Sequence, residues 1–155
     1  MLQLRTEKTV AMTIDIADRA RRWFTDMWGK RDRELLVEWM HEDVVGWSAG
    51  QRVIGRDAWV SSVFEPFTGA FADLRLEIIG TVTEGDQAVI RWRFIGTHTG
   101  DALGVQACGL PLTFDGITWL RFRDGRIVEG QDAFDTSGLM LTLNSRQAHG
   151  AITII

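Results

Sequence analysis

The stretch AVIRWRFIGTHTG, residues 88–100, alternates apolar side chains with arginine and other polar residues before it ends in a glycine-rich segment. Successive side chains of a β-strand point to opposite faces, so this alternation places Ile90, Trp92 and Phe94 on one face. The two arginines between them fall on the other face. Because an apolar face packs against a core, we expect the arginines on the outer surface of a sheet, where they would form ion pairs at an oligomer interface. The alternative is that they face the pocket and bind an anionic or enolate oxygen.

The same two-residue period recurs in three further stretches, separated by turn signals such as Asp124-Gly125. With the opening stretch they predict four strands of an antiparallel meander, at residues 74–83, 88–97, 112–123 and 126–135. Gly80 and Gly116 interrupt two of these patterns. Glycines inside strands often mark bulges, so we expect both positions to bend the sheet.

Upstream of the meander the apolar residues recur at three- and four-residue steps, which is typical of helices. Thr13 and Asp32 are candidate N-caps for two helices, and a third is expected to begin after Gly55 and to end at Pro66. A short strand is expected at Val44–Trp47. Helices followed by a bent meander predict an α+β domain in which three N-terminal helices cover one face of the sheet.

The composition argues against several classes of binding partner and functional site. The 155 residues carry a net charge of −4 and show no basic patch, which argues against nucleic acid. No apolar run reaches the ~18 residues of a membrane span, and the N-terminus does not resemble a signal peptide, so a cytoplasmic protein without a membrane span is expected. No His pair has metal-ligand spacing, and Cys108 is the single cysteine. One domain is predicted over residues 1–155, with residues 1–12 flexible.

Three short motifs carry a resemblance to a known family. They are Gly55-Arg56-Asp57, the GTHTG of residues 96–100, and DGRIVEGQDAFDTSG at residues 124–138. The chain resembles the SnoaL-like polyketide cyclases, which belong to the superfamily of nuclear transport factor 2 and ketosteroid isomerase. This resemblance implies a cone-shaped α+β barrel, in which helices pack on a strongly curved antiparallel or mixed sheet that encloses a pocket. It also implies a homodimer or homotetramer formed through the sheet.

The resemblance further implies a chemistry. These cyclases close the last ring of an aromatic polyketide by intramolecular aldol condensation, without a cofactor, and their catalytic aspartate falls on Asp132. A histidine that the family often carries on the preceding strand is replaced by Thr118. The expected ligand is therefore a hydrophobic, carbonyl-bearing, polyketide-like small molecule, processed by acid–base catalysis.

Strand alternation separates the two acids of the last motif. Asp132 shares a face with Val128, Gly130 and Phe134, whereas Asp135 falls on the opposite face and precedes Thr-Ser-Gly, as a capping residue does. An acid on the apolar face is desolvated, which raises its pKa and makes it useful as an acid or base near neutral pH. The alternative for Asp132 is a buried acid with a purely structural role.

His98 is the second candidate for catalysis, because continued alternation places it on the face of Trp92, where it could polarise a carbonyl or relay a proton to Asp132. A histidine bonded to backbone is the alternative. The glycine-rich segment 96–109 is expected to form a flexible rim. Residues expected to bind the substrate are Trp47, Thr118, Trp119, Phe134 and Trp23.

Related chemistries are distinguished by single residues. Ketosteroid isomerases have their general base near Ser48, and a serine does not abstract a proton from carbon unaided. Limonene epoxide hydrolases pair an acid at Asp132 with an Arg and a second Asp on the central strand, where this chain has Arg91 and Arg93 around a tryptophan. A non-catalytic binding domain, or a hydrolase or hydroxylase of the same fold, stays open as an alternative.

Overall fold

The computed structural model describes residues 14–150, and the side chains of residues 14–146. A six-stranded sheet has the order β2-β1-β6-β5-β4-β3, in which β1 runs parallel to β6 and every other neighbouring pair is antiparallel. Its strands are β1 (Met40–Ser48), β2 (Gln51–Ile54), β3 (Arg75–Glu84), β4 (Gln87–Thr97), β5 (Pro111–Arg123) and β6 (Arg126–Ala133). The α+β class with a curved mixed sheet is confirmed.

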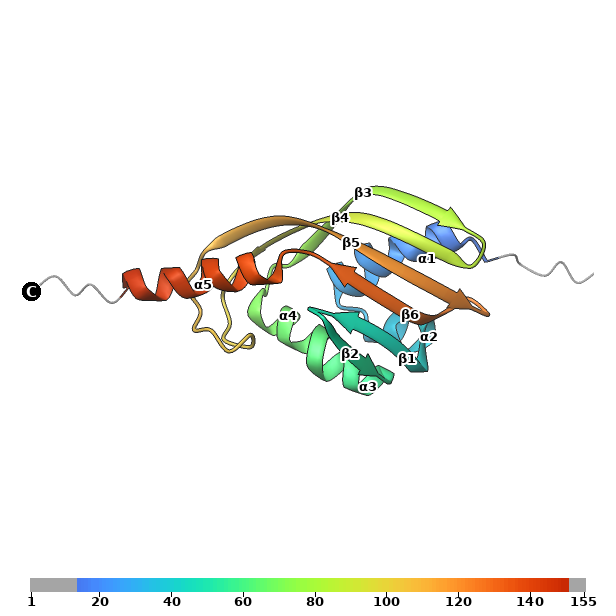
Figure 1. Cartoon of the computed structure of the whole chain (residues 1–155), viewed down its shortest axis with the longest axis horizontal. Helices are drawn as coiled ribbons and strands as arrows, with labels where there is room; N and C mark the ends of the chain where they lie inside the picture. The colour runs from blue at the N-terminus through green and yellow to red at the C-terminus, as the bar shows by residue number, and fades with distance from the viewer. Residues whose placement is uncertain (1–13, 151–155) are drawn as a thin grey trace, which may run out of the picture.

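The helical segments lie largely before the meander. They are α1 (Ile16–Arg22), η1 (Trp23–Trp28), α2 (Arg33–Trp39), α3 (Arg56–Trp59), η2 (Val60–Phe64), α4 (Glu65–Ala70) and α5 (Thr136–Gly150). Figure 1 shows the curved sheet wrapping over α1 to α4, while α5 projects beyond the end of the sheet. The C-terminal helix and strand β2 are additions to the predicted arrangement. No helix among residues 14–150 is both long and apolar enough to cross a membrane.

Capping aspartates define where the helices begin. The Asp15 carboxylate accepts hydrogen bonds from the backbone N–H groups of Ala17 and Asp18, at 2.9 and 3.1 Å, so Asp15 and not Thr13 caps the first helix. Thr13 and the predicted flexible segment 1–12 lie outside the described residues. Asp32 caps α2 as predicted.

The prediction that the third helix ends at Pro66 is wrong, because the helix continues through α4 to Ala70. The turn before the proline is a π-helix, η2. A proline normally breaks a helix by lacking an N–H and by clashing with the carbonyl four residues earlier. The wider π-type turn changes the hydrogen-bonding pattern at that point, so the ring is accommodated without ending the helix.

The two interrupting glycines have different structural roles. A register shift between Ile78 and Gly80 in the β3–β4 pair confirms the bulge expected there. No shift occurs at Gly116, so the bulge predicted for that position is wrong. A Cβ atom on Gly116 would overlap the Trp92 ring on the neighbouring strand. Gly116 is therefore required because the Trp92 indole occupies the space of a side chain.

A second bulge changes the predicted faces of β6. In the β5–β6 pair Phe122 faces Ile127 while Arg121 faces Glu129, so Val128 is the extra residue. Ile127 consequently lies in the core at 1% exposure, and the alternation that leads to Asp132 starts after the bulge. The prediction that Val128 shares the face of Asp132 is therefore corrected to Ile127.

We predict that Gly116→Ala lowers the free energy of unfolding by about 1–3 kcal/mol, because the added methyl group overlaps the Trp92 ring. Gly80→Ala is the matched control on β3, which is separated from β5 by β4. No heavy atom lies within 4 Å of a Cβ atom at Gly80, so its expected change is within about 0.5 kcal/mol. Urea denaturation of both variants measures the difference, and equal stabilities would contradict this account of Gly116.

Candidate functional site

Asp132 projects from β6 toward the space between the sheet and the helices. Its Oδ1 atom accepts a hydrogen bond of 2.6 Å from the Thr118 hydroxyl on β5, which lies directly opposite in the strand register. The Thr118 oxygen in turn accepts a hydrogen bond of 2.8 Å from the indole Nε1 of Trp92 on β4. Three adjacent strands thus contribute one residue each to a chain of hydrogen bonds that ends on the carboxyl group.

The direction of this chain is set by chemistry. An indole N–H donates and cannot accept, so Thr118 must accept from Trp92 and has only its single hydroxyl hydrogen left to donate. That hydrogen is held by Asp132 Oδ1. When Asp132 is protonated, its proton therefore belongs on Oδ2. The Trp92–Thr118 pair leaves one oxygen of the carboxyl group for proton exchange.

Enclosure of the carboxyl group raises the pKa of Asp132 from 3.8 to about 6, and the Thr118 hydrogen bond opposes this by stabilising the ionised form. No lysine or arginine lies among the residues that line the surrounding hollows. The predicted desolvated acid is therefore present, with a pKa that lets it take up and release protons near neutral pH.

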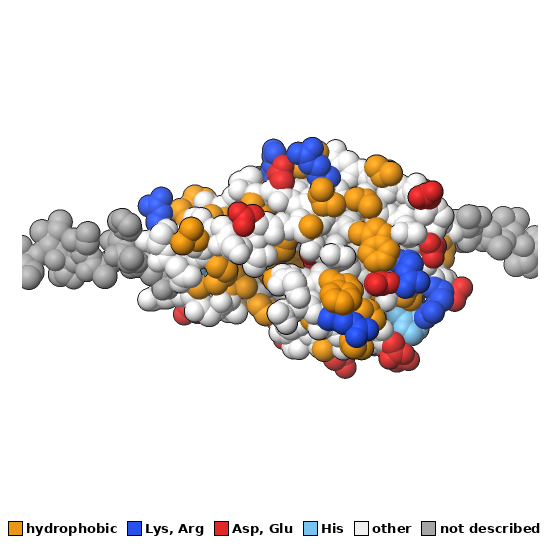
Figure 2. All heavy atoms as spheres, viewed as in Figure 1, with side chains coloured by type: hydrophobic (Ala, Val, Ile, Leu, Met, Phe, Trp, Pro, Cys, Tyr) orange, Lys and Arg blue, Asp and Glu red, His pale blue; other side chains and the backbone are white. Residues whose placement is uncertain are grey.

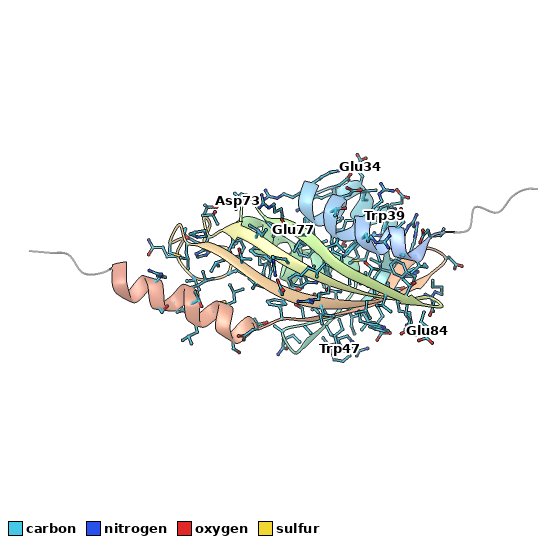
Figure 3. All side chains as sticks on the ribbon, turned by 90° about the horizontal axis from the view of Figure 1, so that it is seen from above. Glu34, Trp39, Trp47, Asp73, Glu77 and Glu84 are labelled. Atoms are coloured by element: carbon cyan, nitrogen blue, oxygen red, sulfur yellow. The ribbon has the colours of Figure 1, made fainter. Side chains whose placement is uncertain are left out.

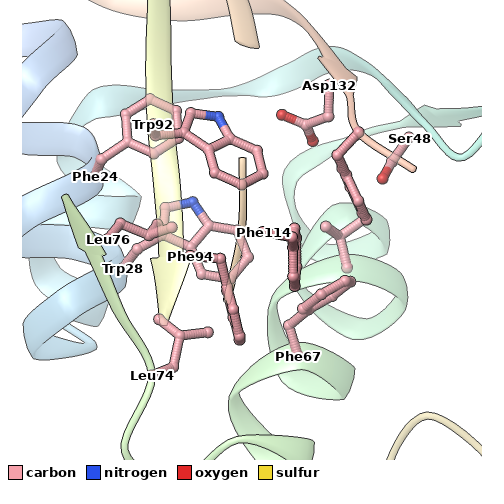
Figure 4. A pocket seen from close by; sticks show the side chains of 12 residues that line it. Phe24, Trp28, Ser48, Phe67, Leu74, Leu76, Trp92, Phe94, Phe114 and Asp132 are labelled. Carbon is pink, nitrogen blue, oxygen red and sulfur yellow. The ribbon is translucent and has the colours of Figure 1, made fainter. Parts of the chain in front are cut away.

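Asp132 borders three hollows. The inner hollow has about 440 Å³ of atom-free space, part of it open to solvent. Its lining is almost entirely apolar, with Asp132 and Ser48 as the polar exceptions besides the indoles of Trp28 and Trp92. Figure 4 shows the Asp132 carboxyl group directed toward Trp92 and the interior of this hollow, with Ser48 beside it.

Stacked phenylalanines form one wall of the inner hollow. The rings of Phe94 and Phe114 lie 4.5 Å apart and 15° from parallel, and Phe114 stacks on Phe134 at 5.5 Å and 26°. Phe67 of α4 meets Phe134 edge-on. Flat aromatic walls around one acid suit a planar, apolar ligand.

The second space, here called the indole hollow, is lined by Trp23, Trp28, Trp59, Gly46, Thr118 and Asp132 together with neighbouring apolar side chains. The third, here called the mouth, is lined by Ala49, Gly50, Asp132, Phe134 and residues 135–137. Asp132 lines all three spaces, so it lies where the apolar interior meets the polar entrance.

The predicted site residues fall into two groups. Asp132, Thr118, Phe134 and Trp23 line the hollows. Trp119 lies on the outer face, where its indole donates to Gln87 at 2.8 Å, and it lines none of the three hollows. Trp47 lines the indole hollow, yet its side chain is 38% exposed and lies under the guanidinium group of Arg52.

His98 is fully buried, and its backbone pairs with Leu110 and Gly109 in the glycine-rich segment. Its Nδ1 lies 3.3 Å from the Cys108 sulfur, and its ring packs against Phe71. None of the three hollows bordered by Asp132 is lined by His98. Its role as a proton relay stays a prediction.

The remaining charged residues considered from the sequence are Asp135 and the two arginines of β4, and they lie where the sequence predicted. Asp135 accepts a hydrogen bond of 2.8 Å from the Gly138 backbone at the start of α5, as expected of a capping residue. Arg91 and Arg93 are exposed on the outer face and form ion pairs with Asp115, at 3.4 and 2.8 Å. Among the described residues no group of three or more His, Cys, Asp or Glu side chains could hold a metal ion.

Several lining residues were missed by sequence reasoning, above all Trp92, Trp28, Trp59 and Ser48. Strand alternation correctly predicts Trp92 in the core, but it does not reveal the hydrogen bond of the indole to Thr118. A signal did exist in Gly116, since a glycine facing a tryptophan across a strand pair indicates that the indole lies flat over it.

Comparison with known proteins supports the resemblance seen in the motifs. The model of the SnoaL-like polyketide cyclase family matches residues 18–143. The chain belongs to this family. No protein of curated function matches the chain in sequence.

Solved structures share the fold. A candidate SnoaL-like polyketide cyclase from Jannaschia sp. CCS1 superposes with a TM-score of 0.77 at 22% identity, covering 84% of this chain and 92% of that one. AclR, a candidate hydroxylase from Streptomyces galilaeus, gives 0.71 at 27% identity, covering 84% and 83%. IdmH, a candidate polyketide cyclase from Streptomyces antibioticus, gives 0.69 at 24% identity, covering 87% and 99%.

The raised pKa of Asp132 predicts a pH-dependent cost to stability. At pH values well below 3.8 the carboxyl is protonated in both the folded and the unfolded chain, so it costs nothing. Above about pH 6 it is ionised in both states, and the enclosed charge then destabilises the fold by on the order of 2–3 kcal/mol. We therefore expect Asp132→Asn to increase the free energy of unfolding at pH 8, and to increase it little or not at all at pH 3.5.

Urea denaturation at the two pH values measures this difference. Asp43→Asn, which replaces an exposed carboxylate of β1, is the control and should change stability by less than about 0.5 kcal/mol at both. A gain for Asp132→Asn that is the same at both pH values would show that the carboxyl is not strained by burial.

Proposed function

We propose that the protein is a cofactor-free enzyme of the cyclase type, which acts on a hydrophobic, carbonyl-bearing, polyketide-like ring system bound in the inner hollow. The observation that supports this most directly is the single enclosed acid with a pKa of about 6, placed where an apolar hollow meets a polar mouth. In an aldol closure, ionised Asp132 takes a proton from the nucleophilic carbon. That carbon then attacks a ketone of the same molecule.

Asp132 also returns the proton that it has taken, so the reaction needs no second proton donor. A carbon–carbon bond forms, the attacked carbonyl becomes an alkoxide, and protonated Asp132 returns its proton to that oxygen, so nothing is oxidised or reduced. Oδ2 is the oxygen that exchanges this proton, because Oδ1 is held by Thr118. The stacked phenylalanine wall would keep the substrate flat and exclude water from the reacting carbon.

We expect Asp132→Asn to lower turnover of an aromatic polyketide methyl ester with an open last ring by about 100-fold or more, because a positioned acid–base contributes that much. The closed product is measured by liquid chromatography with mass detection. Asp43→Asn is the control that should retain activity. Equal turnover in wild type and Asp132→Asn would remove Asp132 from the mechanism.

The pH profile adds a second readout to this experiment. Because the Thr118 hydrogen bond lowers the pKa of Asp132, Thr118→Val should move the acidic limb of the rate profile to higher pH while turnover persists on the alkaline side. A product that has gained water or an oxygen atom would instead favour the hydrolase or hydroxylase alternative.

We also propose that two copies of the chain associate through the outer face of the sheet. One cross-strand row on that face runs from Arg52 through Trp47, Gln131, Trp119 and Val89 to Val82. Val82 and Val89 are 71% and 37% exposed. Figure 2 shows apolar side chains among charged ones on this face, and in Figure 3 Trp47 lies on the side of the molecule away from Trp39. Clustered apolar side chains of this kind mark protein interfaces.

Sedimentation velocity tests this association. Wild type is expected to sediment as a dimer or tetramer, and Val89→Glu should weaken the assembly by about 10-fold or more, because it would bury an unpaired charge. Val37→Glu, at an exposed position of α2, is the matched control. A monomeric wild type, or equal effects of both variants, would exclude this interface.

A further inference from the structure

The seven tryptophans fall into two classes, according to whether the indole N–H group has a hydrogen-bond acceptor in the protein. Three donate to protein acceptors: Trp39 to Glu38, Trp92 to Thr118 and Trp119 to Gln87. Four have no hydrogen-bond acceptor among the described residues, and all four of these line the indole hollow. The coincidence indicates that this hollow gathers donors that the protein itself does not satisfy.

Three of the four lie in the interior. Trp23 and Trp59 are 3% and 7% exposed, and Trp28 is partly buried beside them. Trp47 differs, because its exposed side chain can donate to solvent. Trp59 packs against both other interior indoles, with ring centroids 5.8 Å from Trp23 and 5.6 Å from Trp28. Helical segments η1 and α3 therefore place three indoles around one space.

The N–H groups of these three indoles are not sealed inside the protein. The sealed side-chain polar atoms without a partner among the described residues are Thr81 Oγ1 and His98 Nε2, and no indole nitrogen belongs to that group. The nitrogen edge of Trp59 lies over Gly46, which itself lines the hollow. Because these donors are open and have no acceptor in the described part of the protein, an acceptor oxygen of a ligand can take the place of water on them.

The chemistry of the lining defines that partner. An indole donates and never accepts, so the complementary group is a hydrogen-bond acceptor. Asp132 is the only ionisable residue that lines the hollow, and no lysine or arginine lines it. An anion would find no counter-charge there and would be repelled by ionised Asp132. A neutral carbonyl oxygen fits, as in a ketone or a quinone.

We propose that the indole hollow is a subsite for neutral carbonyl oxygens of an aromatic ligand, held by the N–H groups of Trp23, Trp28 and Trp59. The inner and indole hollows share Phe24, Trp28 and Asp132. A ligand whose reacting carbon lies at Asp132 therefore extends one end between the phenylalanines and the other, oxygenated end among the indoles. This assignment rests on the proposed function for the position of the ligand, and not for the donors themselves.

The test compares 9-fluorenone with fluorene, which have the same planar shape and differ in one carbonyl oxygen. Nitrogen-15 labelled protein gives one indole N–H signal per tryptophan, assigned with single Trp→Phe variants. Fluorenone should move downfield the signals of those interior indoles that donate to its oxygen, which accepts at most two hydrogen bonds, and fluorene should not. The expected preference of wild type for fluorenone is about 5-fold in affinity for each indole N–H that donates to its oxygen, the value of one net hydrogen bond.

Variants isolate the N–H group from the volume of the ring. In Trp28→Phe and Trp59→Phe the preference for fluorenone over fluorene should fall by about 5-fold, since the enlarged space affects both probes alike. Trp39→Phe is the control, because its indole already donates to Glu38 and lies outside the hollow. There the preference should stay unchanged.

Three results would overturn the subsite: equal affinity of wild type for the two probes, binding of fluorenone without movement of the interior indole signals, or no binding of either probe. These readouts are independent of turnover. Loss of the proposed catalysis with retained fluorenone preference would leave a carbonyl-binding pocket without that chemistry. Retained catalysis without the preference would remove the subsite alone.

Discussion

The indole of Trp92 is the element on which the candidate site depends. It lies flat across the neighbouring strand because Gly116 has no side chain, and this position lets its N–H reach the Thr118 oxygen. Since the indole can only donate, one contact sets the direction of the next, and Thr118 donates to Asp132. Packing of one ring thereby determines which carboxyl oxygen can exchange a proton. Gly116 and Thr118 on β5 and Trp92 on β4 together hold the carboxyl group of Asp132 on β6 in position.

The aromatic interior has a similar double role. Most of the rings stabilise the fold by burying apolar area, as the stacked phenylalanines and the packed indoles do. The same rings are rigid and flat, so the spaces they leave unfilled keep a defined shape. Enclosing Asp132 among them costs stability and provides a proton-transfer group near neutral pH. That cost is offset by the burial of many large aromatic side chains in the same core.

Much of the architecture was predictable because strand and helix periods are local properties. The alternation at residues 88–97, 112–123 and 126–135 predicted the strands to within a few residues, and Asp32 and Asp135 were recognised as caps from their own neighbours. The errors came from features that involve two strands or a changed helical turn. Pro66 is tolerated through η2, and the bulge at Val128 shifts the faces of β6. Neither is encoded in the period of the segment itself.

The sequence by itself determined the α+β order, the family motifs and the choice of Asp132 over Asp135, because alternation sends the two acids to opposite faces. Only the tertiary structure decided which tryptophans lie around Asp132 in the candidate site. Trp47 and Trp119 read like pocket residues along the chain, yet their side chains reach the outer surface, while Trp28, Trp59 and Trp92 meet around Asp132 from separate elements. Side chains on distant segments line one space only when helices and sheet close over it. That closure depends on contacts between residues far apart in sequence, which no local pattern specifies.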